Sequence, residues 1–266
     1  MMGLGAAMMD QKYYVVTQAS DSTGNPGYNM RNGLAAAGVP TTRPCHCVTM
    51  RLTLNANVEI GATTTNQALA VQSGWGAGIR KEIAMASGTG GIHGRGAAGG
   101  QGRAFWSPTK VPLDYCGGGG GGAAGRNAGA GGSALGTATY GAAGTLTAGG
   151  GGGSGGIGGV TNRSATVGAN GGYAINVPSG VTVYLVPPSG TTLRLWAGGG
   201  GGGGGGDLGS GGNGGGPGIA GSTGLGFGAA GGGARGTKKQ GTGTISTASS
   251  GYMWVPAGGT VDQRGA

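Results

Sequence analysis

The chain is poor in the side chains on which most enzymes and most globular cores depend. Of its 266 residues, 9% are charged and 5% are aromatic, whereas about 25% of the residues in a typical soluble domain are charged. No run of 18 apolar residues is present, and no basic start leads into the apolar stretch of a secretory signal. We therefore expect neither a membrane-spanning segment nor export by the usual signal route.

The scarcity of titratable groups argues against catalysis. The seven Asp and Glu residues are spread over the whole chain, and no segment gathers them into the carboxylate pair of a glycosidase. His46 and His93 are the only imidazoles, and no nucleophile elbow follows a predicted strand. We expect a protein that is not an enzyme and has no cofactor; a polysaccharide depolymerase is the form that an activity would take.

Cysteine is also scarce, and the three present do not indicate a disulfide framework. Their odd number, in Cys45, Cys47 and Cys116, is typical of a protein made in a reducing cytosol. Cys45-His46-Cys47 places three common metal ligands in a row. A structural zinc ion needs four ligands, however, and only His93 and Cys116 remain to complete the set. The sequence therefore predicts no metal site.

The charge that is present is mostly positive but diffuse. Sixteen Lys and Arg residues against seven Asp and Glu residues give a net charge of +9. The basic residues stand singly, apart from Arg80-Lys81 and Lys238-Lys239, so they form no stripe that would follow a nucleic-acid backbone. We expect no nucleic-acid partner, and a weak general attraction to anionic surfaces such as lipopolysaccharide or acidic polysaccharide.

Glycine is the most abundant residue, with 75 in the chain, of which 51 lie between positions 117 and 236. Glycine recurs at every third position from Gly200 to Gly224, and a shorter register of the same period runs from Gly150 to Gly159. Three residues per turn is the repeat of the polyproline II helix, which has no internal hydrogen bonds and must find partners in neighbouring chains. A collagen triple helix needs about 15–20% proline, but residues 200–224 contain only Pro217. A bundle of polyglycine II helices folded from one chain is therefore favoured.

The alternative to an ordered bundle is a flexible glycine linker. Apolar segments with the character of strands interrupt the glycine blocks, however, and turn sequences such as Pro178-Ser179-Gly180 bound them. Examples are Val181 to Val186 and Leu193 to Trp196. Ordered tracts joined by tight turns fit this pattern better than a linker does.

The first part of the chain is different in character. Residues 48–60 alternate between apolar and polar side chains, which predicts one half-buried strand. The predicted fold is mostly β and irregular, in three parts. Residues 1–87 form a small β-rich attachment module, residues 88–116 a glycine-containing connector, and residues 117–266 a glycine-rich domain of polyglycine II helices with short interrupting strands.

Two stretches resemble known proteins. Val186-Pro187-Pro188-Ser189-Gly190, which leads through Trp196 into the run Gly198 to Gly206, resembles the glycine-rich domain of many bacteriophage tail proteins. Leu52 to Gly61, continuing to Gly94, is similar to the strand-to-glycine transition of tail-fibre tips. In length and architecture the chain is similar to the small adhesins that cap T-even-like long tail fibres.

This resemblance implies a virion protein at a phage tail or tail-fibre tip, assembled in the host cytoplasm, that recognises a bacterial surface protein or lipopolysaccharide. It further implies attachment to other tail or fibre proteins through residues 1–87, as a homotrimer or as a cap on a trimeric fibre. Two other functions stay open. One is a purely structural tail or baseplate subunit, and the other is an antifreeze-like polyglycine II protein.

Large side chains that interrupt the glycine blocks are the candidates for receptor contact, because aromatic and Arg side chains are the usual anchors of interfaces. These candidates are Tyr140, Arg163, Tyr173, Phe227 and Arg235. Tyr184 and Trp196 are instead expected to cover a small apolar core.

Overall fold

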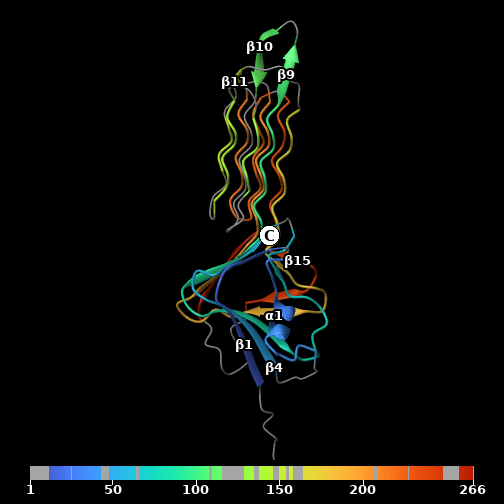
Figure 1. Ribbon diagram of the computed structural model, residues 1–266, viewed down its shortest axis with the longest axis vertical. Coiled ribbons are helices and arrows are strands. Elements are labelled where there is room, and N and C mark those ends of the chain that lie inside the picture. Colours follow the sequence, from blue (N-terminus) through green and yellow to red (C-terminus); the bar gives the residue numbers. More distant parts are fainter. Residues whose placement is uncertain are drawn as a thin grey trace, which may run out of the picture.

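In the computed structural model, most of the regular secondary structure is parallel β-sheet. The structure describes residues 12–24, 26–42, 48–63, 66–107, 110–115, 129–134, 138–145, 150–153, 156–157, 164–206, 209–226, 228–247 and 258–265. Within these ranges lie the strands β1 to β17 and one short helix, α1. The sheets form a compact body at one end of an elongated molecule (Figure 1).

Three parallel sheets, named A, B and C here, make up this body. Sheet A contains, in spatial order, β1 (Lys12–Gln18), β4 (Val48–Leu54), β7 (Arg80–Met85), β13 (Thr182–Leu185) and β16 (Thr244–Ser246). Sheet B contains β2 (Ser22–Gly24), β5 (Glu59–Ala62), β8 (Thr89–His93), β14 (Thr192–Trp196) and β17 (Thr260–Arg264). Sheet C contains β3 (Tyr28–Asn29), β6 (Leu69–Ala70), β12 (Ile175–Asn176) and β15 (Lys239–Gln240).

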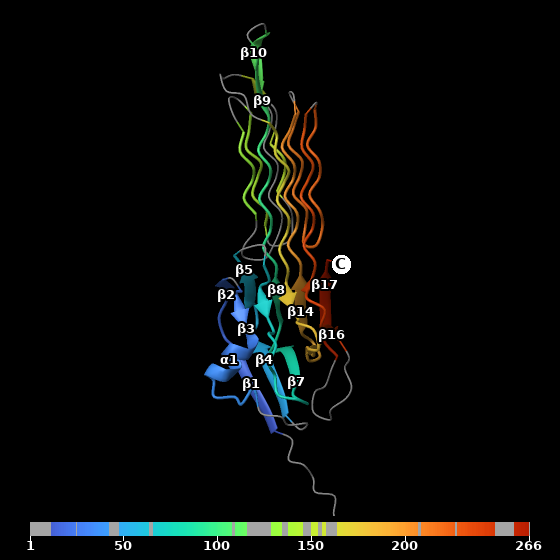
Figure 2. The ribbon, with the colours of Figure 1, turned by 90° about the vertical axis from the view of Figure 1, so that its right-hand side faces the viewer.

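The order of these strands along the chain reveals a winding. Strands β1 to β8 fall on sheets A, B and C in turn, and β12 to β17 continue the same cycle from sheet C. Each complete pass of the chain therefore adds one strand to each sheet, next to the strand of the pass before, and a final partial pass adds β16 to sheet A and β17 to sheet B. Figure 2 shows β5, β8, β14 and β17 side by side as a result. The body is a three-sided parallel β-solenoid.

The core lies between the three sheets and is built in rows. In sheet A, the register aligns Val16, Leu52, Ile83 and Leu185, which face the same side on successive strands. Leu69 pairs with Ile175 in sheet C, and both side chains are fully buried. Because apolar residues stack on apolar residues from one winding to the next, a single hydrophobic cluster runs through the body.

The residues between 54 and 59 turn a corner rather than continuing a strand. Where one strand is predicted over residues 48–60, the structure has β4 and β5 in different sheets. Asn57 adopts a positive φ of 61°, a conformation that Asn tolerates better than most residues, and Val58 N–H donates to the Asn55 carbonyl at 3.2 Å. The apolar pattern continues across this corner because Val58 and Ile60 also face the core.

Helix α1 (Met30–Ala36) lies between β3 and β4. The side chain of Asn29 caps it by accepting a hydrogen bond from Asn32 N–H at 3.1 Å. Met30 and Leu34 are four residues apart and so share one helix face, and both are fully buried in the core cluster. The helix thus adds apolar side chains to the core beside the first winding.

Two long glycine-rich insertions leave the solenoid at the same corner. Residues 94–174 separate β8 from β12, and residues 197–238 separate β14 from β15, so each insertion joins sheet B to sheet C. In the first two windings this corner spans only residues 25–27 and 63–68. The insertions run away from the sheets as extended segments (Figures 1 and 2). At their far end is a small antiparallel sheet of β11 (Gly156–Ile157), β10 (Lys110–Tyr115) and β9 (Ala104–Ser107).

The extended segments bond to one another at every third residue. The N–H groups of Gly198, Gly201 and Gly204 donate to the carbonyls of Gly172, Ala169 and Thr166 at 2.9–3.0 Å. On another side, the carbonyls of Gly199, Gly202 and Gly205 accept from the N–H groups of Ala97, Gly100 and Arg103. The backbone groups of the glycine segments are therefore satisfied by neighbouring segments, as buried backbone requires.

The segment from Gly198 to Gly206 occupies the centre of this arrangement. All nine residues are buried, and bonds connect the segment to residues 97–103, 164–172, 209–215, 219–225 and 230–236. A Cβ atom built on Gly201, Gly202 or Gly203 would overlap a carbonyl oxygen of a different neighbour in each case. The unbroken glycine run is thus the segment that is surrounded on all sides.

These observations correct the predicted fold class. The prediction of a small β-rich module followed by a polyglycine II helix bundle with short interrupting strands is wrong, because the fold is organised by mostly parallel β-sheets with one short helix. The apparent interruptions at residues 175–196 are solenoid strands that pair with strands of residues 69–93. The strands of residues 239–264 pair in turn with those of residues 175–196. The error arose because strand pairing between distant residues leaves no local signal.

Candidate functional site

The predicted receptor-contact residues do not gather at one place. Tyr173 and Arg235 lie on adjoining segments beside the sheets, because Gly171 N–H donates to the Ala234 carbonyl at 3.0 Å and Ile175 N–H to the Lys238 carbonyl at 3.0 Å. Tyr173 is half-buried and Arg235 is exposed. These two candidates therefore stand where the glycine segments meet the body.

Tyr140 lies much farther from the sheets. Gly141 N–H donates to the Gly132 carbonyl, and Gly102 N–H donates to the neighbouring Ser133 carbonyl, each at 3.0 Å. Tyr140 is thus level with Gly102, two residues before β9, and its side chain is 69% exposed. The other two candidates, Arg163 and Phe227, lie outside the described residues.

Two further residues mark the far end of the central segment. Leu225 accepts from Gly206 N–H at 2.8 Å and is 66% exposed, while Arg103 N–H donates to the Gly205 carbonyl at 2.9 Å. The Arg103 guanidinium lies against the next turn, since Nη1 is 2.7 Å from the Cβ position of Gly228. A large exposed apolar side chain and a cation therefore flank the same end. Leu225 could have been found from sequence, because it directly follows the last glycine of the period-three register.

The opposite end of the glycine segments is anchored by an aromatic and charged cluster on the outer face of sheet B. His93 and Trp196 are the last residues of β8 and β14, they pair in register, and their rings meet edge to face at 5.1 Å. The Glu59 carboxylate lies against His93 Nε2, and Gly91 leaves the space for this contact, because a Cβ at position 91 would overlap His93 Nε2. The guanidinium of Arg264 lies 4.1 Å from the Trp196 ring centroid.

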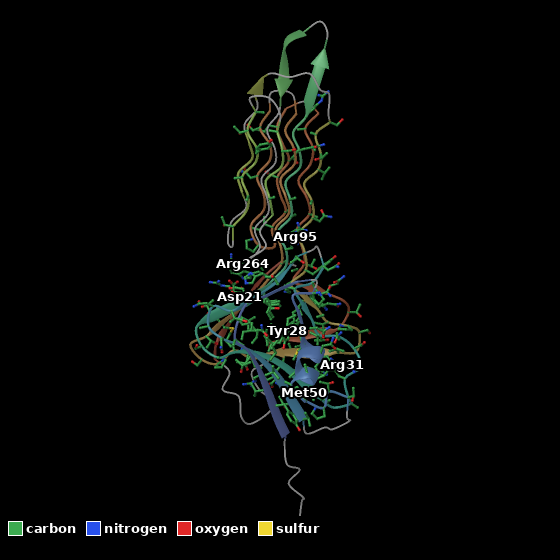
Figure 3. All side chains as sticks on the ribbon, viewed as in Figure 1. Asp21, Tyr28, Arg31, Met50, Arg95 and Arg264 are labelled. Atoms are coloured by element: carbon green, nitrogen blue, oxygen red, sulfur yellow. The ribbon has the colours of Figure 1, made fainter. Side chains whose placement is uncertain are left out.

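This cluster holds the place where both insertions begin. Gly94 N–H donates to the Trp196 carbonyl and Ala197 N–H to the Arg264 carbonyl, each at 2.9 Å. Figure 3 shows Arg95 and Arg264 at this junction, above Asp21, Tyr28, Arg31 and Met50 of the body. Trp196, which was expected to cover a small apolar core, is 2% exposed and packs with these charged groups on the outside of its sheet.

Over the residues that the structure describes, no group of three His, Cys, Asp or Glu side chains could hold a metal ion. The clip Cys45-His46-Cys47 and Cys116 fall outside those residues. No described helix is both long and apolar enough to cross a membrane. No protein-family model, curated protein or solved structure matches the chain.

Proposed function

We propose that the chain is a non-enzymatic adhesin of a bacteriophage tail or tail-fibre tip, which recognises a receptor on the bacterial surface through the far end of its glycine segments. The observation that carries this proposal is the common corner of the two insertions. Both leave the solenoid between sheets B and C and run out together to an end where Leu225 and Tyr140 are 66% and 69% exposed.

The core cluster and the outer turns of the insertions are built from different residues, and this separation supports the proposal. The described core cluster contains only residues from 14–92 and 174–261, so the outer turns of the insertions carry no part of it. Such turns can vary in sequence without a stability penalty in the core, which is the usual arrangement for recognition loops on a rigid scaffold. The sequence resemblance to phage tail proteins points in the same direction.

In this proposal, the solenoid is the attachment part, and residues 1–87 provide the contact with other tail or fibre proteins. Strand β1 is an edge strand of sheet A, and Val15 on it is 50% exposed. An exposed edge strand is a ready template for pairing with a partner chain.

Binding of the purified, fluorescently labelled chain to a panel of Gram-negative strains tests the proposal. The panel includes strains with truncated lipopolysaccharide and strains that lack single outer-membrane proteins. We expect saturable binding to some strains, and loss of that binding in one receptor class. Leu225→Ala together with Tyr140→Ala should weaken binding about tenfold or more, as for a pair of interface hot spots.

Ile219→Ala is the matched control. Ile219 is 60% exposed on the same segment as Leu225 but at its other end, where its carbonyl accepts from Gly200 N–H. This substitution should leave binding unchanged. Absence of binding to every strain, combined with incorporation of the chain into phage particles, would instead establish a purely structural tail subunit.

A further inference from the structure

One edge of the solenoid is long and apolar. Strand β1 ends sheet A on one side, and its seven residues make it the longest edge strand of the three parallel sheets. The other edge strands are short or charged, since β2, β3, β15 and β16 have two or three residues and β17 carries Asp262 and Arg264. Short length and charge are the usual protection of a sheet edge against pairing with another chain. The stretch Tyr13 to Thr17 of β1 has neither.

The backbone of β1 directs every second residue toward the open side of the sheet. The Gln18 carbonyl accepts from Asn55 N–H, next to β4, at 3.1 Å. Residues of a parallel strand bond alternately to one side and to the other. The even-numbered residues of β1 therefore bond to β4, whereas the N–H and C=O groups of Tyr13, Val15 and Thr17 point to the open edge.

The side chains of β1 are also incompletely covered. Val15 on the outer face is 50% exposed. On the inner face Tyr14 and Val16 are only half-buried, although their neighbours on β4 in the same two rows are fully buried. At the opposite end of the body, in contrast, two core rows end in the polar residues Lys239 and Gln263. The apolar core thus reaches the surface at the first winding.

We propose that β1 pairs with β1 of a second copy of the chain, antiparallel and with a two-fold axis at Val15, so that sheet A continues from one chain into the other. In this register Tyr14 lies opposite the partner's Val16, and aromatic residues paired with β-branched ones stabilise sheets. Val15 lies opposite the partner's Val15, and Lys12 opposite the partner's Gln18, so no like charges meet. The strand is complementary to itself, which a two-fold interface requires.

A head-to-tail stack of solenoids is the competing arrangement, in which β1 pairs with β16 of the next copy. It matches seven residues with three, and by continuing the row of sheet C it sets Tyr28 beside the partner's Lys239. Head-to-tail contacts also continue into a filament, whereas a two-fold pair closes with two copies. The two-fold pair goes beyond the proposed function, because it can form whether or not the chain binds a receptor.

Sedimentation velocity of the full chain over a range of concentrations tests the inference. We expect a species with twice the mass of one chain. Val15→Lys places two ammonium groups opposite each other at the two-fold axis and should raise the dissociation constant about tenfold or more. Thr244→Lys adds the same charge to β16, the edge strand at the other end of sheet A, and should leave the dimer intact. Thermal melts followed by circular dichroism check that both variants fold.

A cross-link tests the register without a charged variant. Directly opposite residues of an antiparallel hydrogen-bonded pair have Cα atoms about 5.5 Å apart, which a disulfide can span. Val15→Cys, in a chain that also carries Cys45→Ser, Cys47→Ser and Cys116→Ser, should therefore form a covalent dimer under mild oxidation. Thr244→Cys in the same background is the matched control and should run as a single chain on a denaturing gel without reductant.

Three results would overturn the inference. A parent chain that stays monomeric at every concentration would show that β1 does not pair with itself. A dimer that neither Val15→Lys weakens nor Val15→Cys cross-links would place the interface elsewhere. Assemblies that grow beyond two copies and that Thr244→Lys also dissociates would establish the head-to-tail stack. Loss of receptor binding with an unchanged dimer mass would contradict only the proposed function.

Discussion

At the scale of single residues, the central glycines matter because they have no side chain, which lets neighbouring backbone approach closely. A Cβ atom on Gly202 would overlap the carbonyl oxygen of Gly212, whereas a Cβ atom on Gly231 would meet no atom within 4 Å. Glycine has more backbone freedom to lose on folding than any other residue. Glycine is needed at position 202 because the backbone of another segment of the same chain occupies the space, and not because of its φ angle.

The substitution Gly202→Ala should therefore destabilise the protein by about 1–3 kcal/mol or more, since the overlapped atom belongs to the backbone and cannot rotate away. Gly231→Ala is the matched control and should stabilise the fold by about 0.4–1 kcal/mol, because it only reduces the entropy of the unfolded chain. Chemical denaturation of both variants measures the two changes. Equal effects at the two positions would show that the packing around residues 198–206 is loose.

At the scale of elements, the solenoid and the glycine segments are stabilised by different forces. The solenoid strands bury apolar rows such as Leu52, Ile83 and Leu185. The glycine segments have few apolar side chains to bury and are connected by backbone hydrogen bonds between neighbours. Because the described core cluster draws no residue from 95–173 or 198–237, the solenoid does not rely on the insertions for its core.

A chain in which residues 95–173 and 198–237 are each replaced by Asn-Pro-Gly, the corner of residues 25–27, should fold. We expect a β-type circular dichroism spectrum and one cooperative thermal transition, because every solenoid strand and its partner are kept. Leu52→Asp in the same shortened chain is the control and should abolish the transition, since it buries an unpaired charge. A shortened chain that binds hydrophobic dyes and melts without cooperativity would show that the insertions are needed for folding.

At the scale of the whole molecule, the long glycine part changes the thermodynamics of unfolding. Exposure of apolar surface raises the heat capacity on unfolding, and exposure of polar surface lowers it. The insertions expose mainly backbone when they unfold, because most of their described residues are Gly, Ala, Ser or Thr. The heat-capacity change on unfolding of the whole molecule should therefore be smaller than that of an ordinary protein of the same length.

Differential scanning calorimetry should give a heat-capacity change clearly below the usual value of about 12–15 cal/mol/K per residue. The shortened chain without insertions is the internal standard and should return to the usual range per residue. A full-length chain with an ordinary value would mean that the glycine part buries much more apolar surface than the structure shows.

Local features of the fold were predictable from sequence where the physical cause is local. The alternation over residues 48–60 reflects strand geometry on both sides of the corner, and Leu52, Leu54 and Ile60 all face the core. The corner at Asn57 was missed, since the same alternation continues through it. The pairing of β6 with β12 was also out of reach, because Leu69 and Ile175 meet only through the winding.

For the candidate site, the sequence predicted which kinds of side chain are exposed but not where they lie in the fold. Large side chains among glycines indicated exposed groups, and Tyr140 is indeed exposed. Tyr173 and Arg235 follow the same rule in sequence but lie beside the sheets, because their position depends on the direction in which each segment runs. Leu225 and Arg103 reach the far end for the same reason.

The sequence by itself determined that backbone can approach the stretch Gly198 to Gly206 on every side, because this stretch carries no side chains. It also determined the apolar rows of the strands. Only the tertiary structure decided which segments surround that stretch and which end of each points outward. The central run Gly198 to Gly206 carries no side chains that could specify a neighbour, so its surroundings depend on the sheet B to sheet C corner from which both insertions leave and on polar contacts of the outer segments, such as that of Asn170 Oδ1 with Ala234 N–H.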